Sequence, residues 1–217
     1  MARNVTTVFS LRAVQGGSSI NYWTDRIHSG LLDVSVFDKI LIHLGVIDCL
    51  RILQALQLMH IDSITQPFHV GLRLGSLIEA IRVYNKNAYI IVSGIIPVVN
   101  RDYWCDGIEV IVRAINNVFP IVCANYDRVV FAATQRRFLR SGHARIDCNS
   151  EDGLHLSELG VNTLSIWFGQ LLSDTEISQS LHSKSRANLR DKRINLIKYD
   201  WVTVFKSPVL DSVKLIL

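Results

Sequence analysis

An aspartate and a histidine lie three residues apart in the segment Asp152-Gly153-Leu154-His155, just before an apolar run. An aspartate at this distance can accept the Nδ1–H of the imidazole, which fixes the tautomer and leaves Nε2 free as a general base. The same pattern is also typical of a capped helix with a surface histidine, because a short side-chain oxygen accepts hydrogen bonds from a first helical turn. The pair therefore predicts either acid–base chemistry or a simple helix start.

The segment that follows His155 predicts a helix that would hold the pair in place. Ser157 is a candidate N-cap for it, and so is Asp152. Large apolar residues recur after it at helical spacing: Leu164, Trp167, Phe168 and Leu171. We therefore expect Asp152 and His155 to lie at or just before the start of a partly buried helix.

Short apolar strands alternate with amphipathic helices along most of the chain. The predicted strands cover residues 5–14, 39–44, 88–96 and 129–133. Helical stripes start near residues 20, 46, 74 and 108, with Ser18 or Ser19 as the cap of the first. We expect a loop over residues 60–70, an interruption of the fourth helix at Pro120, and Asn116 on the outer face of that helix.

This alternation predicts an α/β fold with a mostly parallel sheet, arranged as a three-layer α/β/α sandwich. In such a fold the carboxyl ends of the strands meet at one edge, where ligands bind. Gly17 follows the first predicted strand, and Gly45 and Asp48 follow the second. We expect these residues to share that edge with Asp152 and His155.

The block Asp152-Gly-Leu-His155-Leu-Ser, followed by Gly160, resembles the last conserved block of the SGNH (GDSL-type) hydrolases, whose Asp-x-x-His motif completes a Ser-His-Asp triad. The turn at Gly17 resembles the second block, whose glycine N–H contributes to the oxyanion hole. Gly45-Val46-Ile47-Asp48 resembles the third block, Gly-x-Asn-Asp, with isoleucine in place of the asparagine that supplies another donor.

The resemblance implies a flavodoxin-like sheet and an esterase or acyl hydrolase that needs no cofactor or metal. In that chemistry His155 is the base, Asp152 orients it, Gly17 N–H stabilises the oxyanion, and Gly45 and Asp48 line the site. The substrate would be a small ester or acyl compound.

The block that carries the nucleophile, Gly-Asp-Ser after the first strand, does not occur in the sequence. Ser10 lies within a predicted strand, and Ser18 and Ser19 are explained by helix capping. The nucleophile is therefore unknown. We expect a degenerate or N-terminally truncated SGNH-like domain that is inactive as this chain. The alternatives are a non-catalytic binding or interaction module that uses the remnant cleft, and an unrelated flavodoxin-like domain with a phosphate at Gly16-Gly17-Ser18.

In the family, the first strand lies between the second and the third, and its place has no counterpart in this sequence. We expect residues 8–13 to pair directly with residues 40–44, which avoids two rows of unpaired backbone groups. The alternative is that a strand near residues 201–205 enters the gap.

Composition indicates one domain of 217 residues with 49% hydrophobic and 19% charged side chains. We place the SGNH-like domain at residues 1–175 and a basic tail at 176–217, which could form a β-hairpin. Residues 183–217 hold eight of the basic side chains and three acids, without the aromatic pattern of a nucleic-acid site. We therefore expect no nucleic-acid partner, and no pattern indicates an oligomeric state.

The four cysteines are widely spaced and form no C-x-x-C pair, which predicts buried free thiols and no metal site. No apolar run reaches the length of about 18 residues that a membrane span needs. The N-terminus has no convincing signal peptide. A cytoplasmic location is therefore expected.

Overall fold

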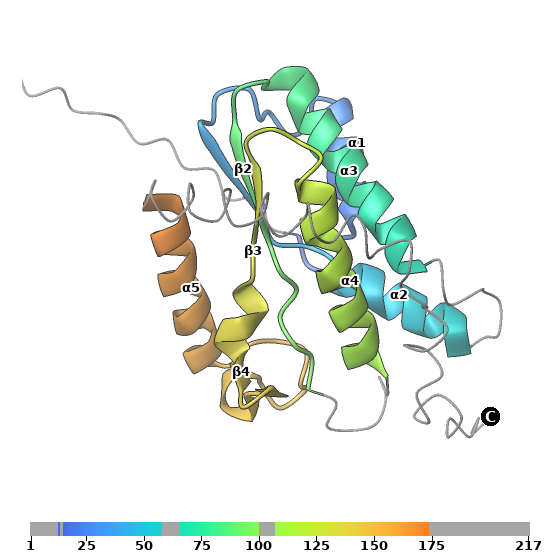
Figure 1. Cartoon of the computed structure of the whole chain (residues 1–217), viewed down its shortest axis with the longest axis vertical. Helices are drawn as coiled ribbons and strands as arrows, with labels where there is room; N and C mark the ends of the chain where they lie inside the picture. Colours follow the sequence, from blue (N-terminus) through green and yellow to red (C-terminus); the bar gives the residue numbers. More distant parts are fainter. Residues whose placement is uncertain (1–12, 14, 58–65, 100–106, 174–217) are drawn as a thin grey trace, which may run out of the picture.

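The computed structural model describes residues 13, 15–57, 66–99 and 107–173, which form a mixed α/β fold (Figure 1). Its centre is a parallel sheet of three strands in the order β1-β2-β3. The strands are β1 (Lys39–Ile42), β2 (Tyr89–Ser93) and β3 (Val129–Ala132). The five α-helices are α1 (Ile20–His28), α2 (Val46–Gln57), α3 (Gln66–Tyr84), α4 (Ile108–Cys123) and α5 (Glu158–Ser173).

The central strand β2 is apolar up to its last residue, Ser93, because both of its faces are covered. Ile90 and Val92 point into a large core that α1, α2, α3 and α4 also line. Ile91 points the other way, into a smaller cluster with Val130 and Leu171 of α5. Figure 1 accordingly shows α5 on one side of the strands, and α3 and α4 on the other. A strand buried on both faces loses the polar alternation of a half-exposed strand, as its sequence indicated.

The predicted alternation of strands and helices is confirmed for the described part of the chain. Two predictions lie outside it: the first strand, at residues 5–14, of which only residue 13 is described, with its direct pairing to residues 40–44, and the tail at 176–217 with its strand at 201–205. None of the described helices is long and apolar enough to cross a membrane.

Two predictions about prolines were wrong. Helix α3 begins at Gln66, so Pro67 lies in its first turn and not in a loop that extends to residue 70. A first-turn N–H has no partner within the helix, so proline loses nothing there. Helix α4 continues through Pro120 to Cys123, and its last turn closes with Ala124 N–H donating to Pro120 O at 3.1 Å. Only three helical residues follow Pro120, so the backbone hydrogen bond that proline cannot donate is lost near the end of the helix.

Asn116 of α4 was expected on the outer face, but it points inward and is buried. Its side chain accepts from Ile95 N–H at 2.8 Å and donates to Ile95 O at 2.9 Å. The two bonds satisfy both backbone groups of a buried residue just after β2. They fix the segment 94–99, which leaves the sheet at its carboxyl edge.

The segment between β3 and α5 is made of short local elements. It contains the 3₁₀ turns η1 (Thr134–Phe138) and η2 (Ile146–Cys148), and a small hairpin of β4 (Leu139–Arg140) and β5 (His143–Ala144). Ser157 caps α5, as expected: its hydroxyl accepts from Gly160 N–H at 3.2 Å, and its own N–H donates to Cys148 O at 3.0 Å. Helix α5 therefore starts directly against η2.

Two glycines of α5 should respond in opposite ways to alanine. A Cβ at Gly160 would collide with the carbonyl oxygen of Cys148, which is backbone and cannot swing away, whereas a Cβ at Gly169 meets nothing within 4 Å. We expect Gly160→Ala to lower the free energy of unfolding by about 1–3 kcal/mol. Gly169→Ala should raise it by roughly 0.5–1 kcal/mol, because alanine favours helix. Urea unfolding of both variants checks this, and equal effects would contradict the tight α5–η2 contact.

Candidate functional site

Asp152 and His155 meet in the turn between η2 and α5, as the sequence predicted. Asp152 Oδ2 lies 2.5 Å from His155 Nδ1. The His155 side chain is 77% exposed and the Asp152 side chain 49% exposed. With Nδ1 engaged by the carboxylate, Nε2 is the ring nitrogen that remains open to solvent. The arrangement can exchange a proton with a molecule that approaches this edge.

The Asp152 carboxylate organises the whole turn. Its Oδ1 accepts hydrogen bonds from the backbone N–H groups of Leu154 and His155, both at 2.9 Å, and from the Ser150 hydroxyl at 2.6 Å. The hydrogen bond from His155, followed by those from Ser150 and the two backbone groups, holds the pKa of Asp152 well below its usual range. The carboxylate is therefore ionised at neutral pH, which both an orienting residue and a turn-capping residue require.

The turn is joined to the segment that follows β2. Val99 N–H donates to Gly153 O at 2.8 Å, and the Asn149 amide donates to Gly153 O at 3.2 Å. Within the turn, Ser150 N–H donates to His155 O at 2.8 Å. The Asp152–His155 turn therefore lies against residues 94–99, at the carboxyl edge of the sheet.

Gly45 lies in the turn after β1, where no other residue would fit. Its φ of +118° falls in the region that only glycine occupies readily, and a Cβ would stand 2.7 Å from Ile95 Cδ1. Ile95 belongs to the same segment, 94–99, that holds Gly153. Gly45 and the Asp152–His155 turn therefore contact opposite ends of one short segment, which places them on the same edge.

Asp48, in the first turn of α2, joins three helices. Its side chain is fully buried; Oδ2 accepts from Ile20 N–H at the start of α1, and Oδ1 accepts from Arg73 Nη1 of α3, both at 3.1 Å. The start of α1 was expected to be capped by Ser18 or Ser19. Ser19 is the N-cap residue but makes no side-chain cap bond, and Asp48 satisfies the Ile20 N–H instead.

The Asp48 bond also brings the two remaining sequence candidates together. Gly17 lies three residues before Ile20, in an exposed turn with φ of +71°, and Gly45 lies three residues before Asp48. The two segments that resemble the second and third SGNH blocks are therefore tied by one hydrogen bond. Ile47, which replaces the asparagine of the third block, offers no donor to this edge.

A histidine–serine contact lies inside the fold, between His43, just after β1, and Ser93, the last residue of β2. His43 Nδ1 is 2.9 Å from Ser93 Oγ, the Ser93 hydroxyl donates to Thr134 Oγ1 at 2.8 Å, and Trp167 Nε1 donates to the same oxygen at 3.1 Å. The His43 ring meets Phe168 edge-on at 5.4 Å between centroids. Ser93 and Thr134 are fully buried.

Burial lowers the pKa of His43 to about 4. The imidazole is therefore neutral at physiological pH and packed beneath α5. A buried serine whose hydroxyl is already shared with Thr134 cannot reach a substrate carbonyl. This chain of polar groups is a hydrogen-bonded part of the interior.

The serines weighed as nucleophiles show no activation in the described part of the chain. Ser18 Oγ accepts from Trp23 Nε1 at 2.9 Å, and Ser19 is buried at 4% exposure. Ser10 lies outside the described residues. Cys49, Cys123 and Cys148 are buried free thiols, as expected, and burial raises the pKa of each. Among the described residues, no group of three histidine, cysteine or acidic side chains gathers as a metal site.

Comparison with models of known protein families gives no match, and comparison with curated proteins gives none either.

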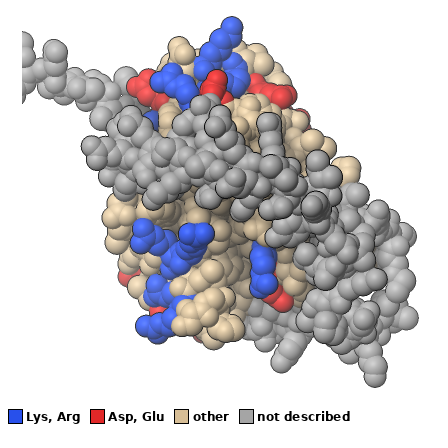
Figure 2. Space-filling model, viewed as in Figure 1, with Lys and Arg blue, Asp and Glu red and all other residues tan. Residues whose placement is uncertain are grey.

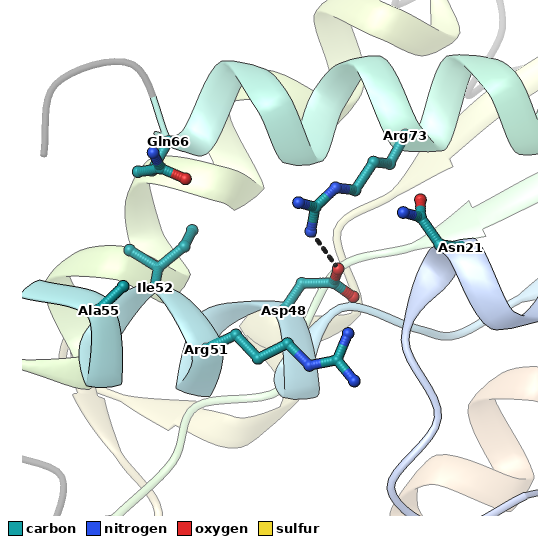
Figure 3. A pocket seen from close by; sticks show the side chains of 7 residues that line it. All are labelled: Asn21, Asp48, Arg51, Ile52, Ala55, Gln66 and Arg73. Carbon is teal, nitrogen blue, oxygen red and sulfur yellow. Dashed lines mark hydrogen bonds and ion pairs between the residues drawn. The ribbon is translucent and has the colours of Figure 1, made fainter. Parts of the chain in front are cut away.

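Sequence reasoning did not find a pair of arginines, Arg51 and Arg73, that border a cavity of about 200 Å³ beside Asp48 (Figure 3). The cavity lies between α1, α2 and α3. Arg51 and Asp48 are three residues apart on one helix, a spacing that puts them on one face. The position of Arg73 on α3 gave no such signal, because only the tertiary fold brings α3 to Asp48.

Replacing Asp48 by alanine should destabilise the protein by about 2–3 kcal/mol. The change leaves the buried Ile20 N–H without its acceptor and removes a charged hydrogen bond to Arg73. Urea unfolding measures the loss, and Asp25→Ala, an exposed aspartate of α1, is the matched control with an expected change within about 0.5 kcal/mol. A loss at Asp48 no larger than the control would mean that the carboxylate does not hold the helices.

His43 should make stability fall as the pH is lowered from about 6.5 to about 4. Over this range the unfolded chain binds a proton at this histidine, whereas the folded chain, whose pKa is about 4, does not. Each pH unit then costs about 1.4 kcal/mol, so wild type should lose roughly 2–3 kcal/mol more than His43→Gln between pH 7 and 4.5. Urea unfolding at both pH values measures this.

The control for this prediction is His143→Gln, which replaces an exposed histidine of β5. Its pH profile should follow wild type. A His43→Gln profile parallel to wild type would show that His43 titrates equally in the folded and unfolded chain.

Proposed function

We propose that this chain is a degenerate SGNH hydrolase-like domain that keeps the base and its orienting residue but has no nucleophile of its own. The observation that carries the proposal is the 2.5 Å contact between Asp152 Oδ2 and the exposed His155, in the turn at the carboxyl edge of a parallel sheet. In acyl transfer, His155 would take a proton from an attacking hydroxyl, and Asp152 would hold the imidazole in the required tautomer.

The remaining blocks support the proposal to different degrees. Gly45 sits in a turn that tolerates only glycine, and Asp48 ties this turn to the segment that follows Gly17. We assign Gly17 N–H to the oxyanion hole on the resemblance alone. Ile47 removes one oxyanion donor, which costs on the order of 10²–10³ in rate. Lack of a nucleophile costs on the order of 10⁶.

The proposal includes the finer architecture. We infer a three-layer α/β/α sandwich with a flavodoxin-like sheet, in which β1, β2 and β3 take the places of the third, fourth and fifth family strands. The order β1-β2-β3, all parallel, agrees with this arrangement. Residues 5–14 would add the second strand, beside β1.

The second candidate function is a non-catalytic binding module. The observation that favours it is the cavity beside Asp48, which is bordered by Arg51 and Arg73 and lies next to the third block but uses none of the catalytic chemistry. A fold that has lost its nucleophile can keep such a cavity without change, because binding needs only shape and charge.

The full chain should show no serine hydrolase activity. Hydrolysis of p-nitrophenyl acetate and butyrate should not exceed that of His155→Ala, because among the described residues no serine hydroxyl is hydrogen-bonded to the His155 imidazole. A fluorophosphonate probe should leave the chain unlabelled, as intact mass spectrometry would show. Stoichiometric labelling at Ser10, Ser18 or Ser19 would identify a nucleophile and contradict the proposal.

The pair itself is tested by the protonation of the ring nitrogens. In neutral His155 the proton should reside on Nδ1, held by Asp152, and ¹⁵N chemical shifts of both nitrogens report this directly. In Asp152→Asn the Nδ1 preference should be lost. Identical shifts in wild type and variant would mean that Asp152 only caps the turn.

A further inference from the structure

The cavity beside Asp48 is bordered by two guanidinium groups that come from different helices. Figure 3 shows Arg73 reaching from α3 to Asp48, while Arg51 extends from α2 toward Asn21 at the start of α1. Arg73 uses Nη1 to bind Asp48, and its side chain is 37% exposed. Arg51 is exposed and has no side-chain partner among the described residues. Both groups therefore have N–H donors directed at solvent or at a ligand.

The charges around the cavity do not cancel. Asp48 is neutralised by Arg73, and both of its oxygens are occupied, one by Arg73 and the other by Ile20 N–H. Arg51 then adds one positive charge, so the three side chains carry a net charge of +1 (two arginines and one aspartate). This surplus balances one negative charge, so it matches a monoanion, whereas the second charge of a dianion would be left unbalanced.

The arrangement of the hydrogen-bond donors and the apolar lining of the cavity indicate which kind of monoanion fits. Arginine presents its N–H groups as a planar fork, which binds a carboxylate through two parallel hydrogen bonds. Ile52 and Ala55 form an apolar part of the lining. The volume of about 200 Å³ equals that of roughly six or seven water molecules. It is below the 300–1,000 Å³ that is usual for drug-sized ligands.

We propose that this cavity is a binding site for a small organic carboxylate, held by Arg51 and Arg73 with Asn21 as a further donor and with its short apolar chain against Ile52 and Ala55. The inference rests on the second candidate function, the binding module, and not on ester chemistry. The experiment that tests this inference measures only ligand binding. A failure of the hydrolase proposal would therefore not affect the carboxylate site.

Titration of the full chain, followed by ¹H–¹⁵N NMR, tests the site with three probes: sodium acetate, sodium butyrate and inorganic phosphate, at pH 7.5 and constant ionic strength. The Nε–H signals of Arg51 and Arg73 and the amide of Asn21 should shift with saturation. Butyrate should bind more tightly than acetate, by about fourfold for each added methylene that enters the apolar part. Phosphate should bind more weakly than either carboxylate.

Four variants assign the binding to this cavity. Arg51→Gln should weaken butyrate by about tenfold or more, because it loses a charged hydrogen bond. Arg51→Lys, which keeps the charge but not the fork, should be intermediate. Ala55→Leu fills the space, keeps every charge and should abolish saturation. Arg113→Gln, an exposed arginine of α4 outside the cavity, is the matched charge control and should bind like wild type.

Each of three results would overturn the proposal. Equal weakening by Arg113→Gln and Arg51→Gln would show a general effect of charge. Phosphate binding as tight as butyrate binding would exclude the carboxylate assignment. Linear shifts without saturation for all three probes would show that the cavity is not a site. Thermal unfolding of every variant verifies that it is folded under the conditions of the titration.

Discussion

The buried carboxylate of Asp48 is the constraint on which the arrangement of the first half of the chain depends. A fully buried charge is tolerated only when its hydrogen bonds are satisfied, and here one oxygen takes the first N–H of α1 and the other takes a guanidinium of α3. Because Asp48 itself belongs to α2, three helices must meet at one point. The same requirement sets the distance between the Gly17 turn and the Gly45 turn.

The carboxyl edge of the sheet is built around a second constraint, the segment 94–99. The segment follows the central strand β2, and it contacts the turn after β1, helix α4 and the Asp152–His155 turn. Asn116 satisfies its first buried residue, Ile95, while Gly45 leaves room for the Ile95 side chain. At its other end Val99 N–H binds the turn that carries Asp152 and His155. The position of His155 therefore depends on how Gly45 and Asn116 pack against Ile95, at the other end of the segment 94–99.

Local patterns in the sequence predicted what depends on local chemistry. The Asp152–His155 contact and the Ser157 cap follow from spacings of three residues, and both occur. The cap of α1 was mispredicted because its acceptor, Asp48, lies 28 residues away. Asn116 was misplaced for the same reason: its partner is a backbone 21 residues distant. The arginine cavity has no local signature, since Arg73 reaches Asp48 only when α3 packs beside α2.

His43 and His155 show how environment decides chemistry. His43 touches a serine hydroxyl, the arrangement expected of a nucleophile and its base, yet burial keeps the imidazole neutral down to a pH of about 4 and Thr134 already shares the hydroxyl. Among the described residues no hydrogen bond joins the His155 imidazole to a serine hydroxyl, but the ring is exposed and rests on an ionised carboxylate. Of these two histidines, only His155 presents its ring to solvent. A serine next to a histidine is therefore insufficient for catalysis here, and under the hydrolase proposal His155 would still need a hydroxyl from elsewhere.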